Sequence, residues 1–333
     1  MACFGMENYH TVSLEILSHG GYTKNRTGVD TITLFRPDKY KKFDLQKGFP
    51  LLTTKKMDGP LWKSLVSELV WYISGKTSIK EFNKHSGIWK AWDLGGEDVG
   101  AAYPWQLRQY EGVDFKTKQV IKIDQLKNLV EGIKQSPQSR RHIISYWNPA
   151  QVRQGIDVGL PACHAFYNFH VQDGKLSLSM TQRSCDMFLG VPFNIAHSAL
   201  LTHLIARETG LGVGHFAHTL VNAHFYCGAG EHGEFYKQNI GTIQTKLGAV
   251  QSQEDYLGIK DFIESNAPAE KEGLQQDHVT GILEQLAREP YTLPVLDLSN
   301  LATGLFDLTF DDVAKIKLKE YQSHPRIKRD IAV

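Results

Sequence analysis

The chain of 333 residues has no long hydrophobic run and almost no net charge. No apolar run approaches the roughly 18 residues that a membrane-spanning helix needs, and the first residues, MACFGMENYHTV, lack the pattern of a signal peptide. We therefore expect a cytoplasmic protein without a membrane partner. A formal net charge of +1 gives no general attraction to nucleic acid, so an anionic ligand is expected in a pocket and nucleic acid is not an obligatory partner.

Cysteines and the common metal and nucleotide motifs are also scarce. The four cysteines are too few for a disulfide framework and none belongs to a CxxC pair, so we expect reduced thiols at Cys3, Cys163, Cys185 and Cys227. Although the chain has 14 histidines, neither HExxH nor a comparable ligand spacing occurs, which argues against a catalytic metal. No GxGxxG or GxxxxGKS/T motif stands between a strand and a helix, so nucleotide binding of those types is not expected.

The periodicity of the remaining sequence predicts an α+β fold with a mixed sheet, in a single domain covering residues 1–333. Apolar residues at helical spacing predict helices over 58–76, 124–137 and 192–210. Apolar or alternating runs predict strands over 140–147, 164–171, 175–183 and 218–226. Residues 27–45 are predicted to be paired strands, and Asp173-Gly174 is predicted to be a hairpin turn. The polar, partly helical stretch at about 232–285 is predicted to be a surface insertion.

Glu68 and Cys163 are the candidates for chemistry. Glu68 lies on an otherwise apolar helix face beside Leu65 and Leu69, where burial would raise the pKa of its carboxyl and suit it for proton transfer; a solvated face is the alternative. Cys163 follows Pro161, and nearby arginines could lower the pKa of its thiol, as a nucleophile requires. A buried structural cysteine is the alternative, and a thiol hydrolase would need a separate histidine with an orienting Asn or Asp.

Arginines at the boundaries of predicted elements suggest a phosphate site. They are Arg26, Arg140, Arg141 and Arg183, the last with Ser184 beside it. Planar guanidinium donors with a hydroxyl suit a phosphate dianion, although any single one of these arginines could be a solvated charge. Together with Cys163 they favour a small phosphorylated substrate.

Four further residues could recognise flat rings. Asn194 opens a predicted helix, where it could cap the helix or, because an amide both donates and accepts, read the edge of a pyrimidine. Trp89, Trp92 and Tyr103 could belong to the core or form a stacking wall for a flat cofactor.

Several segments occur in an order that carries a family resemblance. They are NRTGVDT, GFPLLTTKK, SELVWYISG, IWKAW, SRRHIISYWNP, LPACHAF, QRSCDMFLGVPFNIA, HTLVNAHFY and the terminal IAV. In this order the chain resembles the thymidylate synthase family, which includes pyrimidine-nucleotide hydroxymethylases. The resemblance covers about residues 22–230 and runs again from about 285 to the end, so the stretch between is atypical of the family.

The resemblance implies the thymidylate synthase-like fold, an enzyme and a mechanism. Cys163 would add to C6 of a pyrimidine, and C5 would become a carbon nucleophile that attacks the methylene of 5,10-methylenetetrahydrofolate. Glu68 would organise water and protons at the ring. The catalytic residues that it implies are Cys163, Glu68, Tyr103, Asn194, Arg183 and Asp186.

The resemblance also implies the ligands. The substrate would be dUMP, because asparagine at position 194 goes with uracil, and because Arg141 and Ser184 match the deoxyribonucleotide members. The implied dUMP-binding residues are Arg26, Arg140, Arg141, Gln182, Arg183, Ser184, Asn194, His224 and Tyr226, with Arg140 and Arg141 reaching from the other subunit of an obligatory homodimer. The implied folate-binding residues are Lys55, Trp89, Trp92, Leu160, Asp186, Gly190, Phe193 and Val333.

Two outcomes of the reaction stay open at this point. A synthase excludes water and uses hydride from tetrahydrofolate, giving dTMP and dihydrofolate, whereas a hydroxymethylase lets water add, giving 5-hydroxymethyl-dUMP and tetrahydrofolate. Trp89 and Val333 favour the synthase, which we expect. The departures from the family pattern favour the hydroxymethylase, and they are Pro104, Val221-Asn222 and Gly228-Ala229. A non-catalytic nucleotide- or RNA-binding relative is the third possibility, although the candidate nucleophile, carboxylate and arginines are all present.

Overall fold

The computed structural model describes residues 6–25, 27–38, 42–93, 95, 97–152 and 160–332, so Arg26 and Val333 lie outside the described residues. The α-helices are α1 (Glu7–His19), α2 (Pro60–Ser74), α3 (Ile79–Asn83), α4 (Tyr103–Gln109), α5 (Gln125–Gln135), α6 (Gly190–Thr209), α7 (Gly230–Gly248), α8 (Gln253–Asn266) and α9 (His278–Leu286). The strands are β1 (Gly21–Thr23), β2 (Val29–Phe35), β3 (Lys42–Asp44), β4 (Tyr110–Val113), β5 (Val120–Ile123), β6 (Ile143–Ser145), β7 (His164–Gln172), β8 (Lys175–Asp186), β9 (Gly212–Ala229), β10 (Val295–Asp297) and β11 (Lys317–Lys319). Short 3-10 helices are η1 (Lys90–Trp92), η2 (Leu305–Asp307) and η3 (Phe310–Lys315). None of the described helices is long and apolar enough to cross a membrane.

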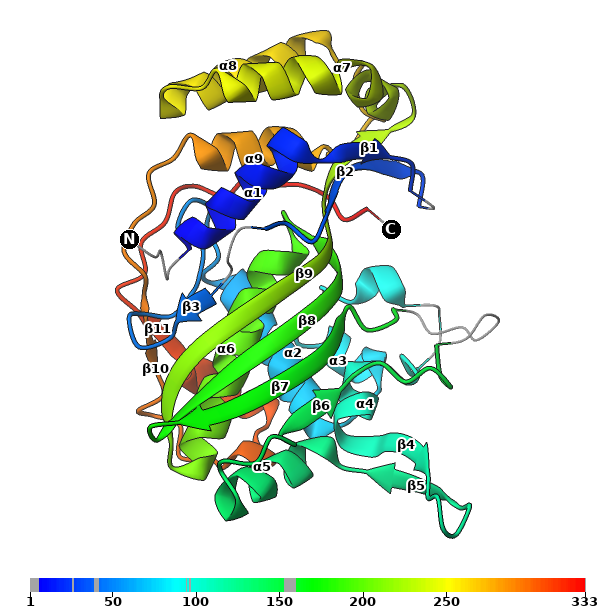
Figure 1. The fold of residues 1–333 in the computed structure, drawn as a ribbon, viewed down its shortest axis with the longest axis vertical. Coiled ribbons are helices and arrows are strands. Elements are labelled where there is room, and N and C mark those ends of the chain that lie inside the picture. Colours follow the sequence, from blue (N-terminus) through cyan, green and yellow to red (C-terminus); the bar gives the residue numbers. More distant parts are fainter. Residues whose placement is uncertain are drawn as a thin grey trace.

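The main sheet is mixed, as Figure 1 shows. Its strands follow the order β1-β2-β9-β8-β7-β6, with β3 also paired to β9. Strands β8 and β9 are parallel, and the other neighbours are antiparallel. The mixed α+β architecture predicted from the sequence is therefore confirmed. The pairing predicted within 27–45 is wrong, because β2 pairs with β1 and β9 while β3 pairs with another part of β9; alternation identifies strands but not their partners.

The turn predicted at Asp173-Gly174 is confirmed. Both residues have positive φ, 50° and 69°, and the flanking Gln172 and Lys175 are paired across β7 and β8. Such a two-residue loop matches the right-handed twist of its strands, and glycine adopts the conformation without strain. The register that follows places Leu178 and Met180 of β8 in the core.

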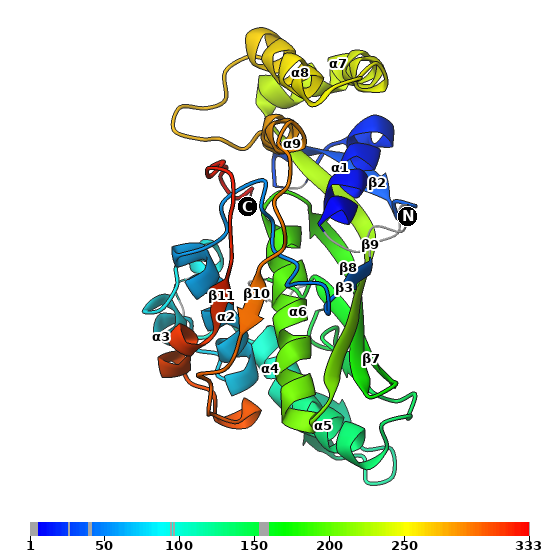
Figure 2. The ribbon, with the colours of Figure 1, turned by 90° about the vertical axis from the view of Figure 1, so that its left-hand side faces the viewer.

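Helices cover one face of this sheet. Most of α6 is buried, with contacts to β8 and β9, and α2 lies beyond α6 (Figure 2). Helix α2 is buried around most of its circumference, as its apolar sequence predicts, and it ends at Gly75 with φ 70°. In both views no described helix lies on the other face of β7 and β8, where Phe166 is 38% exposed. The sheet therefore keeps one bare face.

The range predicted to be a surface insertion contains elements of two kinds. Helices α7 and α8 stand at one end of the molecule (Figure 1), and in α8 only Ile259 and Ile263 are buried. Helix α9 differs, because Val279 and Ile282 are 0% exposed and the helix packs on β9 and α1. The prediction of a surface insertion therefore does not hold for α9, because the apolar residues of this helix, at helical spacing, belong to the core.

Candidate active site

Cys163 stands directly before β7, between α4 and β8. Its backbone N–H donates to the hydroxyl of Tyr103 over 2.7 Å. Arg183 donates through Nε to the carbonyl of Ala162 (2.9 Å) and through Nη2 to that of Pro161 (2.8 Å), and its Nη2 lies 3.9 Å from the Sγ of Cys163. Because two carbonyls fix this guanidinium, a positive charge is held beside the thiol.

The contacts within one chain do not ionise this thiol. Burial raises the pKa of Cys163 above its ordinary value, and Arg183 and Tyr103 act in the opposite direction without cancelling the rise. A thiol with a raised pKa is protonated at neutral pH. Forming the thiolate therefore needs additional positive charge or a proton acceptor near Sγ.

Glu68 projects from α2 into a buried aromatic cluster. Nε1 of Trp89 donates to its Oε1 over 2.7 Å, and the glutamate side chain is 15% exposed. Burial raises the pKa of Glu68 to about 7, although hydrogen bonds with Trp89 and Tyr72 oppose the rise. The burial and the direction of the pKa shift predicted from the helix face are confirmed, and Glu68 can take up or release a proton near neutral pH.

Two tyrosines connect Glu68 with Cys163. The rings of Tyr72 and Tyr103 stack with centroids 4.8 Å apart and planes 10° apart. Trp89 packs edge-on against Tyr103 at 6.3 Å. Cys163 and Glu68 therefore both contact one aromatic cluster. Tyr103 of this cluster also holds the backbone of Cys163 through its hydroxyl.

A pair of amides joins α6 to β8. Nε2 of Gln182 donates to Oδ1 of Asn194 over 2.9 Å, and Oε1 of Gln182 lies 2.8 Å from Nε2 of His218. Asn194 also contacts His164; burial lowers the pKa of His164 to about 4, and the contact with Asn194 opposes this. Because α6 already begins at Gly190, Asn194 does not cap the helix. Its amide is instead held in a fixed orientation inside the site.

The parallel register of β8 and β9 brings the other polar candidates side by side. Ser184 lies opposite Asn222, and Asp186 lies opposite His224. Nδ1 of His224 is 2.9 Å from Oδ1 of Asn222, which orients the ring, and Tyr226 packs edge-on to His224 at 5.2 Å. Asn222, one of the departures from the family pattern, thus still supplies an oxygen to this histidine.

Asp186 is an ionised carboxylate bound through one oxygen. The N–H groups of Phe188 and Leu189 donate to Oδ1 over 3.0 and 3.2 Å, and Nδ1 of His278 lies 3.5 Å from the same atom. Burial raises the pKa of Asp186, but His278, His224 and the backbone outweigh it and lower the pKa to about 2. All these contacts fall on Oδ1, which leaves Oδ2 for donors of a ligand.

Lys55 is bound within the protein. Its Nζ donates to the carbonyl of Phe188 and lies 3.8 Å from the centroid of the Phe188 ring. Burial lowers the pKa of Lys55 to about 7, and Asp186 opposes the shift. In this structure Lys55 therefore supports the turn after Asp186. The other described candidates for the folate site are the buried Trp89 and the half-buried Trp92, Leu160, Gly190 and Phe193.

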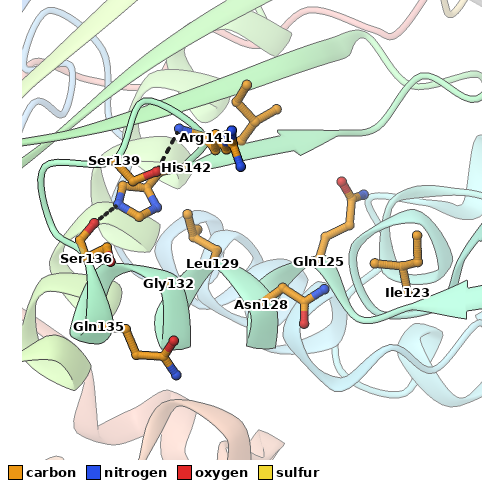
Figure 3. Close-up of a pocket in the computed structure, with 11 residues that line it drawn as sticks. Ile123, Gln125, Asn128, Leu129, Gly132, Gln135, Ser136, Ser139, Arg141 and His142 are labelled. Atoms are coloured by element: carbon orange, nitrogen blue, oxygen red, sulfur yellow. Dashed lines mark hydrogen bonds between the residues drawn. The ribbon is translucent and has the colours of Figure 1, made fainter.

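Arg140 and Arg141 are exposed and far from Cys163 of the same chain. They precede β6, in which Ile143 pairs with Asn168, so at about 3.3 Å per residue they lie on the order of 20 Å along β7 from Cys163. Figure 3 shows Arg141 at a cavity of about 330 Å³ between α5 and β6. None of the other candidate site residues lines that cavity. One chain does not bring these two arginines to its own nucleophile.

Two buried histidines at the site were missed by the sequence reasoning. His197 lies 3.8 Å from Glu68, and His278 lies 3.5 Å from Asp186. His197 follows Asn194 by three residues on one helix, so helical spacing could have found it. His278 has no such signal, because the chain passes through α7 and α8 before it returns beside Cys227 of β9.

The comparisons with known proteins agree with one another. The sequence profile of the family described as thymidylate synthase matches residues 7–333. A protein named thymidylate synthase from Haloferax volcanii is 39% identical over 332 residues, covering 96% of this chain and 94% of the relative.

Proposed function

The chain belongs to the thymidylate synthase family and is an enzyme of that type; on this premise we propose that it converts dUMP and 5,10-methylenetetrahydrofolate to dTMP and dihydrofolate. The observation that carries the proposal is the cluster that joins Cys163, with Arg183 at 3.9 Å from its sulfur, to Glu68, whose pKa is about 7. Substitution at C5 of a pyrimidine needs a nucleophile for C6 and a group that exchanges protons near neutral pH.

Cys163 forms and later breaks the covalent bond to the substrate. Its thiolate adds to C6 of uracil, and the electron pair of the C5–C6 double bond moves to C5, conjugated with the C4 carbonyl. The fixed guanidinium of Arg183 stabilises the thiolate before attack and after release. Once C5 has lost its proton and the methyl group is complete, the C6–S bond breaks, its electron pair returns to sulfur and the C5–C6 double bond is restored.

Glu68 and Asn194 act on the base. Asn194, held by Gln182, orients the uracil edge through its amide. Glu68, with its raised pKa, takes up and returns protons at the ring through hydrogen-bonded water. Ser184 on β8, with His224 and Tyr226 on β9, would bind the phosphate and the sugar hydroxyl, and Arg26 would bind the phosphate as well.

The residues present fit a reduced folate, which when bound supplies the one-carbon unit and the hydride. Asp186 is ionised and has Oδ2 available for pterin N–H donors. Trp89 and Trp92, with ring centroids 5.7 Å apart and ring planes at 62°, form an apolar corner beside Glu68. Trp89 is 2% exposed, and a site lined in this way excludes water, which favours the methyl over the hydroxymethyl product. The family resemblance assigns Val333 to the folate site as well.

The working unit in this proposal is a homodimer in the cytoplasm. The bare face of β7 and β8 is available for a second copy, and the exposed Arg140 and Arg141 lie too far from their own Cys163 to serve it. Arginines from the partner subunit would complete the phosphate site and add the positive charge that the buried thiol lacks. The free thiols of Cys163 and Cys227 suit a reducing compartment.

Product analysis tests this function. The protein is incubated with dUMP and 5,10-methylenetetrahydrofolate, the nucleotide product is identified by mass, and dihydrofolate is followed by absorbance. We expect dTMP and dihydrofolate in equal amounts. Cys163→Ala should abolish turnover while dUMP binding survives, and Cys227→Ala, which removes a buried thiol outside the site, should retain activity. A hydroxymethyl product without dihydrofolate, or full turnover in Cys163→Ala, would contradict the proposal.

A further inference from the structure

His197 is a buried histidine whose nitrogens are both unsatisfied. It lies on α6, is 1% exposed, and neither Nδ1 nor Nε2 has a hydrogen-bond partner among the described residues. A buried polar group without a partner destabilises a protein by about 1–3 kcal/mol. Such a group therefore calls for a functional explanation.

The surroundings of His197 direct it toward Glu68. Nε2 of His197 is 3.8 Å from Oε2 of Glu68, while Nε1 of Trp89 donates to the other oxygen, Oε1. The ring of Tyr72 packs edge-on to the imidazole at 5.0 Å and limits its rotation. A distance of 3.8 Å is longer than a hydrogen bond, but catalytic contacts in ligand-free sites often tighten when the reacting complex forms.

We propose that His197 is a positioning residue for Glu68: its neutral imidazole presents Nε2–H to Oε2, so that the carboxylate is held between two N–H donors, one on each oxygen. The carboxylate then keeps one orientation toward the substrate when it ionises. The donor role falls to Nε2 because this is the ring nitrogen that faces Oε2, and the oxygen of an ionised carboxylate can only accept.

No described group that faces this pair competes with Glu68 for titration near neutral pH. The neighbouring tyrosines all have pKa values raised by burial, and they are Tyr72 on α2, Tyr103 on α4, Tyr146 after β6 and Tyr167 on β7. Burial lowers the pKa of His197 to about 3 and that of His164 to about 4, so both imidazoles are neutral. A carboxyl titration near pH 7 can therefore be assigned to Glu68, since Lys55, whose pKa is also about 7, has no carboxyl band.

Two variants of similar size separate the donor from the packing. His197→Gln places an amide N–H near the position of Nε2, whereas His197→Leu fills the space without a donor. In the ligand-free protein the ionisation of Glu68 is followed by the infrared carbonyl band of its protonated carboxyl, assigned by its loss in Glu68→Gln. We expect His197→Leu to raise the pKa of Glu68 by about one unit and His197→Gln to leave it within about 0.3 unit of the wild type.

The pH profile of kcat gives the second readout, and it rests on the proposed function. The limb of the kcat profile that depends on Glu68 is identified by its absence in Glu68→Gln. This limb should move to higher pH in His197→Leu and should lie at the wild-type pH in His197→Gln. The His197→Leu variant is used only if its thermal unfolding matches that of the wild type. If the pKa of Glu68 in that variant is equal to or lower than in the wild type, His197 does not position Glu68. If the wild-type protein makes no dTMP, the proposed function is wrong. The infrared measurement then decides alone whether His197 positions Glu68.

Discussion

Asp277 is the residue at which helices α7 and α9 are tied together, and replacing it by alanine is expected to lower stability strongly. Its Oδ2 accepts from the hydroxyl of Tyr236 over 2.7 Å and lies 3.2 Å from Nε2 of His232, both on α7. Its Oδ1 accepts from the N–H groups of Val279 and Thr280 over 2.9 and 3.2 Å and so caps α9. Asp277 itself is 3% exposed, so water cannot replace it.

The expected loss follows from these contacts. Leaving the Tyr236 hydroxyl and the His232 ring without a partner should remove about 1.5 kcal/mol each, and loss of the N-cap about 1 kcal/mol, so Asp277→Ala should lower the free energy of unfolding by about 4 kcal/mol. Tyr236→Phe keeps the cap and should lose only about 1.5 kcal/mol. Ser78→Ala, which removes the half-buried N-cap of α3, gives the cap effect alone, about 1 kcal/mol.

The assay is urea unfolding at a fixed protein concentration, repeated over pH. Burial raises the pKa of Asp277, but His232 and Tyr236 outweigh it and lower the pKa, so its stabilisation is lost as pH falls through the lowered value. Burial lowers the pKa of His232, but Asp277 outweighs it and raises the pKa, so that part is lost as pH rises through the raised value. The difference between wild type and Asp277→Ala should therefore be largest between the two, near pH 5 to 6. A loss no larger than that of Ser78→Ala, or one independent of pH, would refute the reasoning.

Two further predictions concern the substrate site. Asn194→Asp should lower kcat/KM for dUMP by about 100-fold and raise the relative rate with dCMP, because the carboxyl cannot present the amide donor; unchanged uracil selectivity in competition assays would refute the base-reading role. Cys163→Ala and the double variant Arg140→Ala/Arg141→Ala should each be inactive, yet after subunit exchange the mixture should recover about one quarter of wild-type activity, since half of the dimers then hold one complete site. If the mixture stays inactive although exchange is demonstrated, the arginines do not act across the dimer.

The parts that the sequence predicted are those set by local patterns. The apolar circumference of α2 was enough to predict that Glu68 is buried, and the Asp173-Gly174 pair was enough to place the turn between β7 and β8. In both cases the decisive contacts follow from residues within a few positions of each other. Burial then raises the pKa of Glu68 by a mechanism that requires no knowledge of distant partners.

The parts that it did not predict depend on distant segments. No local pattern indicates that the amine of Lys55 donates to the carbonyl of Phe188, which is 133 residues away in the chain. The contact of His278 with Asp186 arises because α9 returns to the end of β9 after α7 and α8. Hydrophobic periodicity predicts such helices and strands but does not predict which of them contact each other.

The return of residues 321–330 to the front half of the chain has a consequence for biosynthesis. The hydroxyl of Tyr321 donates to the carbonyl of Leu52 over 2.7 Å, the N–H of His324 donates to that of Thr53 over 2.8 Å, and the ring of His278 lies 2.9 Å from the carbonyl of Asp330. During synthesis Cys163 is added to the chain roughly 10 to 30 s before Asp330, at about 5–20 residues per second. Throughout that interval the nucleophile exists in a chain that cannot yet complete the support of Asp186. A nascent chain arrested before residue 321 should therefore be inactive, although it already contains Cys163, Glu68 and Asp186.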